Sequence, residues 1–446
     1  MKNLDREILR LALPSIVSNI TVPLLGLCDV TIMGHVGGAE SIGAIAVGSM
    51  IFNVMYWLFV FLRMSTSGLT AQAYGARQWA ETRSILKRSL VTALLFGLAI
   101  VVLQVPLQWL TFWLMQADGE VAAMCMPYYY ICIWGAPAVL GLYVLMGWFV
   151  GMQNTRVPMM IAIGQNVVNI GLSLLLVIGF DMGIRGVAIG TLVAQWLAFL
   201  VGLRLAVPKW RKAITTEEGT YKASPSWGRF FAEQSGRTER EGAFSFWGRL
   251  EGTLFLRTLC LVSVNLYFTS AGSAQGPLIL AANTLLMQFF LLYSYIMDGF
   301  ANAGEALAGR YLGASDGMML DCTVRRLFLW GCAMALLFTV VYWLGGTPLL
   351  QLLTSDGEVV STAQTYLPWA VLIPVAGMAA FVWDGIFIGT TMSRGMLVSC
   401  FWAAVTFFVL WFVLSPMWHN HALWIALLTY LAMRGLLQTF LWKKRK

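Results

Sequence analysis

The sequence predicts an all-α polytopic membrane protein, with twelve transmembrane helices in two six-helix lobes related by an internal repeat. Three observations lead to this fold class. Hydrophobic residues make up 59% of the chain and charged residues only 11%, whereas charged residues make up about a quarter of a soluble domain. Apolar segments long enough to cross a bilayer, which needs about 20 residues, follow one another along the whole chain. Motifs of the first half return in the second half at a constant spacing.

The first half contains six apolar segments that we expect to span the membrane, at residues 9–33, 41–67, 86–114, 122–150, 157–180 and 184–206. Each is bounded by polar or charged residues, which are costly inside a bilayer. In order along the chain, the segments are separated by His35/Glu40, Arg77/Arg83/Lys87/Arg88, Asp118/Glu120, Arg156 and Asp181/Arg185.

The second half contains six further segments, expected at residues 252–270, 277–304, 324–350, 360–389, 395–415 and 421–441. They are separated, in order, by a neutral turn near Gly272, Arg310/Arg325/Arg326, Asp356/Glu358, Arg394 and His419/His421, and the basic tail Lys443–Lys446 follows the last of them. Every second loop is basic, so all the basic loops of both halves fall on one side of the membrane. Because basic loops stay in the cytoplasm, we expect a multi-pass protein of the cytoplasmic (inner) membrane with both termini cytoplasmic.

One long polar stretch, residues 208–249, divides the chain near its middle. We interpret it as a cytoplasmic linker between a lobe of residues 1–207 and a lobe of residues 250–446; a docking site for a regulator is the alternative. The net charge of +8 is dispersed over short loops. This pattern indicates control of topology and does not indicate binding of nucleic acid.

The two halves repeat in one register. Asp118-Gly119-Glu120-Val121 returns as Asp356-Gly357-Glu358-Val359, and Phe149-Val150-Gly151 returns as Phe387-Ile388-Gly389. We call the common offset in numbering the repeat shift; it equals 238, because 356 minus 118 and 387 minus 149 both give this value. With six spans in each half, the repeats share one orientation and are related by an axis along the membrane normal. Such duplication is typical of secondary transporters, whose binding sites lie near the midplane.

Acidic residues inside the spans are not repeated. By the repeat shift, Asp29 corresponds to Tyr267, Asp298 to Val60 and Asp384 to Met146, as the paired positions in the sequence show. The scaffold is therefore duplicated without its buried acids, which predicts that the two lobes hold different sites.

The first span carries the strongest functional signal. Asp29 lies well inside this apolar segment, where an aspartate costs about 3 kcal/mol, so it marks a candidate functional site. Pro14 and Pro23 each free a backbone carbonyl and allow the helix to bend. We interpret the segment as a moving helix with a titratable group; a structural acid bonded to Asn or Thr across helices is the alternative.

The spans resemble the multidrug and toxic compound extrusion (MATE) family, in its branch close to the DNA-damage-inducible protein F (DinF). The resemblance covers nearly all spans and is carried by LALPSIVSNITVPLLGLCDVTIMGH at residues 11–35, RTLCLVSVNLYFTSAGSAQGPLILAANTLLMQF at 257–289, DGFANAGEALAGRYLGA at 298–314 and DGIFIGTT at 384–391. It implies a protein of two six-helix lobes that exports substrates in exchange for protons or sodium.

The family's first-lobe cation site can be carried over by position. Its first-span acid corresponds to Asp29, its fifth-span Asn to Asn169 and its sixth-span Thr to Thr191. The family often has a second carboxylate four residues after the Asn, where this chain has Ser173. The resemblance therefore implies an ion-coupling site of these four residues, with the proton favoured over sodium as the coupling ion.

A second set of polar residues is predicted to line the substrate cavity: Asn19, Asn265, Tyr267, Gln288, Asp298 and Asp384. For Asp298 and Asp384, pairing with Arg310 or Arg394 at a helix end is the structural alternative. Met and aromatic residues suit a promiscuous apolar cavity because thioethers and rings adapt to varied ligands. Most of these apolar residues are nevertheless expected to face lipid or the interface.

The resulting hypothesis is a cation-coupled, proton-driven antiporter that exports amphipathic or cationic xenobiotics by alternating access. A sodium-coupled exporter of the same fold is one alternative. A lipid-linked precursor flippase is another; it would favour a strongly cationic cavity, but the buried arginines that this needs are absent, with Arg63 and Arg257 as the only candidates. No metal-ligand, catalytic-dyad or phosphate-loop motif indicates an enzyme or an ATP-driven pump. We expect a monomer without cofactor or bound metal, whose partners are small-molecule substrates and membrane lipids.

Overall fold

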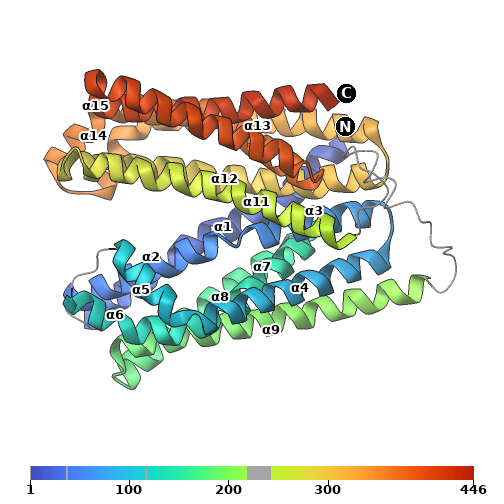
Figure 1. The fold of residues 1–446 in the computed structure, drawn as a ribbon, viewed down its shortest axis with the longest axis horizontal. Coiled ribbons are helices and arrows are strands. Elements are labelled where there is room, and N and C mark those ends of the chain that lie inside the picture. Colours follow the sequence, from blue (N-terminus) through green and yellow to red (C-terminus); the bar gives the residue numbers. More distant parts are fainter. Residues whose placement is uncertain (1, 37–38, 116–118, 218–242, 446) are drawn as a thin grey trace. The chain divides into compact units, whose positions relative to one another are not determined.

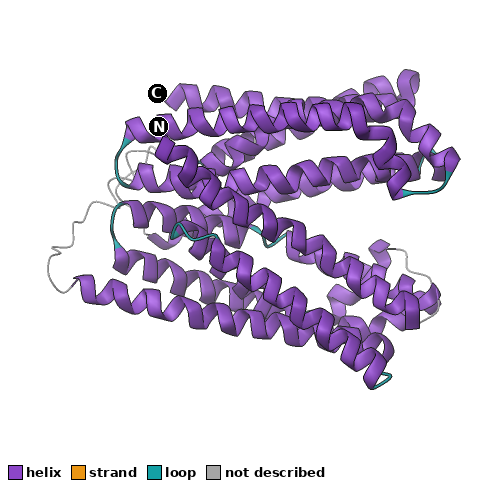
Figure 2. Cartoon of the chain, turned by 180° about the vertical axis from the view of Figure 1, so that it is seen from behind, coloured by secondary structure: helices purple, strands orange, loops and turns teal. Residues whose placement is uncertain are grey.

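The computed structural model of the chain describes residues 2–36, 39–115, 119–217 and 243–445 (Figure 1). Within these ranges it does not describe the side chains of residues 2, 22–31, 33–42, 114–121, 208–247 and 445. The described residues form helices joined by short turns, without a strand among them (Figure 2).

The first half of the chain forms nine α-helical segments in the described residues. Three of the expected spans are interrupted near their middle, so that each consists of two helices; in the third of these spans a 3₁₀ turn at Ile133–Gly135 makes the break. The helices are α1 (Lys2–Val36), α2 (Ala39–Trp57), α3 (Phe61–Gly75), α4 (Trp79–Val102), α5 (Gln104–Met115), α6 (Gly119–Cys132), α7 (Ala136–Gly151), α8 (Arg156–Leu174) and α9 (Gly183–Glu217).

The described part of the second half forms longer helices: α11 (Ala243–Ser273), α12 (Pro277–Gly313), α13 (Gly317–Leu353), α14 (Gly357–Gly389) and α15 (Ser393–Arg445). α15 contains two spans, because His419 has φ 44° and ψ −122° and the chain folds back there (Figure 1). Ten helical segments of the described residues are long and apolar enough to cross a membrane. With α15 counted as two spans and α1 added, the predicted twelve-span fold is confirmed.

Helix boundaries follow the repeat. α2 and α3 together run from Ala39 to Gly75, and α12 runs from Pro277 to Gly313, so the repeat shift relates both ends. It also relates the ends of α4–α5 to those of α13, and the ends of α6–α7 to those of α14. One register therefore holds in the backbone as well as in the sequence motifs.

The turns between helices repeat in the same register. Arg77 and Ser315 both have φ 57°, in the left-handed region that side-chain-bearing residues rarely adopt. The next residue closes each turn in the same way: Gln78 N–H donates to the Ala73 carbonyl at 2.9 Å, and Asp316 N–H donates to the Tyr311 carbonyl at 2.9 Å. The same left-handed backbone conformation at two repeat-related positions shows that the two halves share one local structure at this turn.

A close helix contact also repeats. A Cβ atom on Gly147 of α7 would lie 2.3 Å from the carbonyl oxygen of Arg63 on α3, and a Cβ atom on Gly385 of α14 would lie 2.1 Å from that of Ala301 on α12. The repeat shift relates the two glycines to each other and the two partners to each other. Small residues allow membrane helices to approach at the backbone, so these glycines set the spacing of the central helix pair in each half.

The chain forms two compact units. The first-half unit contains residues 17–251, and the second-half unit contains residues 1–16 and 252–446. In the first-half unit, α7 packs against α3 and α4, and α9 packs against α6 and α8. In the second-half unit, α14 packs against α12, α13 and α15.

The first sixteen residues therefore lie outside the predicted lobe of residues 1–207. Asp5 pairs with Arg326 at 3.4 Å, and Glu7 pairs with Arg310 at 3.4 Å, so the start of α1 is held by the second-half unit. Ile16 packs on the bare backbone of Gly299. These charge pairs between distant parts of the chain leave no periodic signal in the sequence.

The predicted linker of residues 208–249 is shorter in the structure, because α9 continues to Glu217 and α11 begins at Ala243. Residues 218–242 lie outside the described residues. Several helices also extend beyond the predicted spans, since the apolar signal marks the part of a helix that crosses the bilayer and polar turns can extend it at either end.

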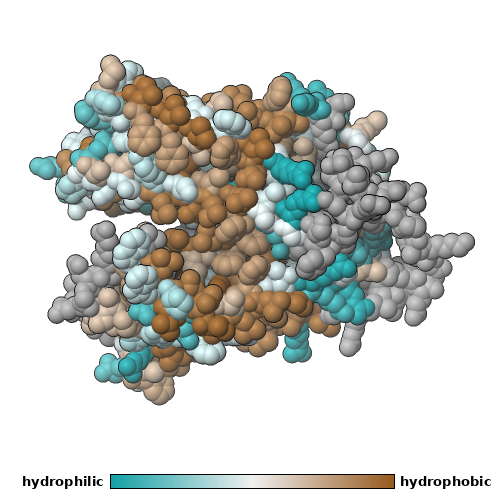
Figure 3. Space-filling view, viewed as in Figure 1, coloured by the Kyte–Doolittle hydropathy of each residue, from teal (hydrophilic) through white to brown (hydrophobic). Residues whose placement is uncertain are grey.

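Large apolar side chains are exposed along the middle of the helices. On the face in Figure 3, hydrophobic residues occupy this middle region and hydrophilic residues gather toward the helix ends. Leu95 on α4 is 62% exposed, Trp343 on α13 is 73% exposed and Phe412 on α15 is 63% exposed. Such surfaces are stable in lipid and would be costly in water, which agrees with a membrane-spanning chain.

Candidate functional site

A buried polar group lies between α8 and α9 in the first-half unit. Asn169 is 1% exposed, Ser173 is 0% exposed and Thr191 is 7% exposed. The Asn169 Nδ2 atom donates a hydrogen bond to the Thr191 Oγ1 atom at 2.7 Å. Asn169 and Ser173 are four residues apart on α8 and therefore share one face of that helix. The structure thus brings together three of the four predicted ion-coupling residues.

Two oxygen atoms of this group are buried without a hydrogen-bond partner among the described residues: Asn169 Oδ1 and Ser173 Oγ. A buried polar atom without a partner is costly, so each such atom needs an explanation. Both are neutral oxygen acceptors of the kind that can accept a proton-bearing group or contact a cation.

The backbone around Ser173 is shaped for a close approach. A Cβ atom on Gly190 of α9 would lie 2.6 Å from Ser173 Oγ, so only glycine leaves room for the hydroxyl. A π-helical turn at Leu175–Gly179 follows α8 directly. Turns of this kind are frequent at functional sites in helices.

The side chain of Asp29 lies outside the described residues, although α1 is helical through this position. α1 contacts α8 at Thr21, eight residues before Asp29: Asn166 Nδ2 of α8 donates a hydrogen bond to the Thr21 carbonyl at 2.7 Å. In the twelve-span topology α1 and α8 run in the same direction. A helix rises about 1.5 Å per residue, so residue 29 lies about as far beyond Thr21 as Ser173 lies beyond Asn166.

In the second-half unit, the side chains at the positions related by the repeat to Asp29, Asn169 and Ser173 are all described. The repeat shift relates Tyr267, Phe407 and Trp411 to Asp29, Asn169 and Ser173. Trp411 Nε1 donates to the Tyr267 hydroxyl at 3.0 Å, and the rings of Tyr267 and Phe407 are 6.2 Å apart. An aromatic triplet thus stands at the positions that correspond to Asp29, Asn169 and Ser173.

The remaining predicted cavity residues lie on α1, α11 and α12. Asn265 is half-buried and donates to the Leu261 carbonyl of its own helix at 2.9 Å. Gln288 is exposed, and Asp298 and Asn19 are half-buried. Asn19 belongs to the first-half unit and the other three to the second-half unit.

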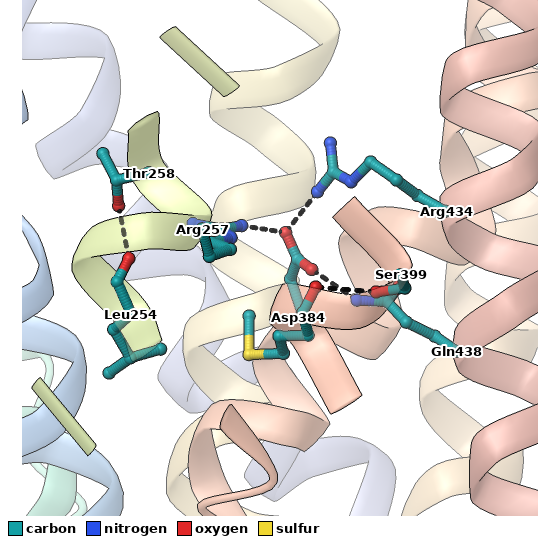
Figure 4. A network of polar contacts seen from close by, with 8 residues as sticks. Leu254, Arg257, Thr258, Asp384, Ser399, Arg434 and Gln438 are labelled. Atoms are coloured by element: carbon teal, nitrogen blue, oxygen red, sulfur yellow. Dashed lines mark hydrogen bonds and ion pairs between the residues drawn. The ribbon is translucent and has the colours of Figure 1, made fainter. Parts of the chain in front are cut away.

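Asp384 of α14 forms a buried charged cluster with residues of two other helices, α11 and α15 (Figure 4). Its Oδ2 atom accepts hydrogen bonds from Arg257 Nη2 of α11 and from Arg434 Nη2 of α15, and its Oδ1 atom accepts one from Gln438 Nε2 at 2.8 Å. Arg257, Asp384 and Arg434 are 4%, 8% and 6% exposed, and Gln438 is fully buried. We call these four residues the Arg–Asp–Arg cluster.

The alternative prediction, that Asp384 pairs with Arg310 or Arg394 at a helix end, is wrong. Arg394 is exposed, and Arg310 pairs with Glu7 at 3.4 Å. Asp384 pairs instead with arginines on α11 and α15, because packing of α14 against α15 brings the second half of α15 to it. The described part of the chain contains no group of three or more His, Cys, Asp or Glu side chains that could hold a metal ion.

Arg434 and Gln438 escaped the sequence analysis, although a signal was present. Both lie inside the predicted span 421–441, where an arginine is rare and usually faces the protein interior. They are four residues apart and share a helix face. Buried Arg434 corrects the expectation that Arg63 and Arg257 are the only candidates for buried arginines.

Comparison with known proteins identifies the family. Residues 14–175 and 254–417 match the model of the MatE family. The chain is 36% identical over 440 residues to DNA damage-inducible protein F of Escherichia coli, and the alignment covers 99% of this chain and 92% of that protein. The chain belongs to the MatE family. The two matched segments of MatE lie in the two halves of the repeat, and the predicted family is confirmed.

Less similar proteins also match the chain. The chain is 23% identical to a probable multidrug resistance protein NorM of Thermotoga maritima, over 80% of this chain and 74% of that protein. A MOP superfamily transporter of Pyrococcus furiosus has a TM-score of 0.83 at 18% identity, covering 99% of this chain and 95% of that one. The Vibrio cholerae MATE transporter VcmN in its bent form has a TM-score of 0.80 at 19% identity, covering 100% and 97%. The last two likenesses show the fold.

Proposed function

We propose that this chain is a proton-coupled antiporter, which exports amphipathic or cationic compounds across the cytoplasmic membrane by alternating access. The observation that carries the proposal is the buried polar group of α8 and α9, in which Asn169 Oδ1 and Ser173 Oγ have no partner among the described residues. α1 and α8 are in contact at Thr21 and Asn166, which supports a shared role of Asp29 and this group.

The chemistry of the group favours a proton over sodium. A hard cation needs several oxygen ligands in place of its hydration shell. Here Asn169, Ser173 and Thr191 are all neutral, and the Thr191 hydroxyl oxygen already accepts a hydrogen bond. A proton needs only the carboxylate, and burial among apolar residues favours the neutral, protonated form of an acid. Ser173, where the family often has a second acid, thus supports proton coupling.

In the proposed cycle, Asp29 is neutralised either by a proton or by a cationic substrate. Protonation removes the buried charge and allows α1 to bend near Pro14 or Pro23, since proline removes a helical hydrogen bond. The bent helix favours release of the substrate outside, and loss of the proton inside resets the cycle. Competition for one carboxylate is what makes the transport an exchange.

Export driven by each ion gradient in turn tests the proposal. In proteoliposomes with a pH gradient and no sodium, we expect export of a fluorescent organic cation at a rate that falls to background when a protonophore is added. A sodium gradient at equal pH should give no export above liposomes without protein. Robust export under the sodium gradient alone would contradict proton coupling and favour the sodium-coupled alternative.

The orientation of the chain is a separate expectation. Cytoplasmic termini require the loop between α13 and α14, which includes Asp356, to face outward. A single cysteine in place of Asp356 should react with an impermeant maleimide in intact cells, and one in place of exposed Arg394 should react only after permeabilisation. The reverse pattern of labelling would contradict this topology. The native cysteines are replaced by serine or alanine beforehand.

A further inference from the structure

The Arg–Asp–Arg cluster belongs to the second-half unit, whereas the proposed ion-coupling group belongs to the first-half unit. The repeat shift relates its residues Arg257, Asp384, Arg434 and Gln438 to the first-half residues Asn19, Met146, Trp196 and Leu200. All four counterparts are uncharged. The first half builds the same helix arrangement without charges at these positions, so the fold itself does not require the cluster.

Arg434 has a buried donor that Asp384 does not accept. A guanidinium carries five N–H donors, and both guanidiniums contact the same carboxylate oxygen, Asp384 Oδ2. The Nε atom of Arg434 is buried and has no hydrogen-bond partner among the described residues. Arg434 as a whole is 6% exposed. A buried guanidinium donor of this kind is expected to have an acceptor, since leaving it without one is costly.

The charge of the cluster points to the same kind of ligand. Two guanidiniums and one carboxylate give the four side chains a formal charge of +1. Buried charges are normally paired, and a charge near the membrane interior is costly unless it is compensated. Arginine binds carboxylate and phosphate groups through its planar fork of donors. A monovalent oxyanion beside Asp384 would make the cluster neutral and supply an acceptor for Arg434.

We propose that the Arg–Asp–Arg cluster is a binding site for an oxyanion, a carboxylate or phosphate group carried by a small amphipathic molecule or by a lipid headgroup. Arg434 donates to the bound oxyanion, and Asp384 holds the two guanidiniums at a fixed separation. A coupling cation at Asp384 is disfavoured, because the two guanidiniums already contact its Oδ2 atom and repel a further positive charge. The proposed oxyanion site can be tested independently of the proposed antiport, because binding can be measured without export.

The test is a binding titration of the full chain in nanodiscs of phosphatidylcholine. The probe is pyrenebutyrate, whose ring accepts excitation energy from the protein's tryptophans, of which there are 19. Pyrenebutanol, which has the same ring and no charge, is the matched control ligand. We expect saturable binding of pyrenebutyrate and only unsaturable partitioning of pyrenebutanol. Equal binding of the two probes would overturn the proposal.

Two substitutions give opposite expected shifts in affinity. Asp384→Asn removes the internal negative charge and should tighten the binding of pyrenebutyrate about tenfold, a change of about 1.4 kcal/mol. Arg434→Gln removes a donor and a positive charge and should weaken binding by at least that factor. If the cluster only stabilised the fold, Asp384→Asn would not tighten binding, and that result contradicts the proposal.

Arg310→Gln is the control for the loss of one arginine, because Arg310 pairs with Glu7 at a partly exposed position of the same unit. Its affinity for pyrenebutyrate should equal that of the unchanged chain. Gel filtration and helical circular dichroism check that each variant is folded. If Arg434→Gln does not fold, the comparison of the two probes on the unchanged chain and the sign of the Asp384→Asn shift still decide the matter.

Displacement experiments separate the two sources of the oxyanion. Displacement of pyrenebutyrate by phosphatidate in the nanodisc, but not by inorganic phosphate, assigns the site to a lipid headgroup. Displacement by inorganic phosphate assigns it to a soluble anion. If neither displaces the probe, the site is selective for carboxylates. A pyrene-bearing quaternary ammonium that competes with pyrenebutyrate for the same site would overturn the proposal.

Discussion

Asp29→Asn is expected to reduce proton-driven export to the background of liposomes without protein. The substitution keeps the size of the side chain and removes both its charge and its ability to take up a proton, so neither a proton nor a cationic substrate can be exchanged at this position. Export of a fluorescent cation under a pH gradient measures the effect. Binding of the cation, measured separately, should weaken as well, because both ligands share one carboxylate.

Tyr267→Phe is the matched control, since Tyr267 stands at the repeat-related position. It removes only the hydroxyl that accepts a hydrogen bond from Trp411, and the ring contacts with Phe407 remain possible. Export should stay measurable and keep its dependence on the pH gradient. If both variants lost export equally, the asymmetry between the two halves would have no functional meaning.

Gly385→Leu is expected to cause the largest loss of stability among single substitutions in the second-half unit. A Cβ atom at this position would lie 2.1 Å from the carbonyl oxygen of Ala301, and a backbone atom cannot move aside as a flexible side chain can. Overpacking of this kind costs about 1–3 kcal/mol and occasionally more, and we expect the upper end of this range because α12 and α14 would have to separate. Thermal unfolding of the purified protein in detergent measures the change.

Gly345→Leu serves as the control for this experiment. Gly345 lies within a helix of the same unit, α13, and a Cβ atom there meets nothing within 4 Å. The same increase in side-chain volume should leave the unfolding temperature unchanged or raise it, because leucine favours helix more than glycine does. An unfolding temperature of Gly385→Leu equal to that of Gly345→Leu would show that the close approach of α12 and α14 is not required.

The sequence was sufficient for the fold because the signals that specify it are local. Apolar length predicts each span, and the repeat of motifs such as those at Asp118 and Asp356 predicts the arrangement of the halves. Breaks within spans, as between Trp57 and Phe61, were not foreseen, since the apolar character of the segment continues across them. The reversal at His419 was expected as a loop, and the structure makes it a single kink between two helical runs.

The sites were only partly predictable. Asn169, Ser173 and Thr191 were found by position within the family, and the structure joins them through one hydrogen bond of 2.7 Å and close packing with α9. Arg434 could not be paired with Asp384 from sequence, because the two are far apart along the chain and meet only through the packing of α14 on α15. Contacts between distant segments need the tertiary structure.

The aromatic triplet of Tyr267, Phe407 and Trp411 has a consequence for the stoichiometry of transport. Of the two repeat-related positions 29 and 267, only one has a carboxylate, so each cycle of the proposed antiport exchanges one proton for one monovalent organic cation. Such an exchange moves no net charge across the bilayer. The membrane potential, which contributes about 2.3 kcal/mol per elementary charge at about 100 mV, therefore does no work on it. Export should respond to the pH difference alone and be indifferent to valinomycin-imposed voltage.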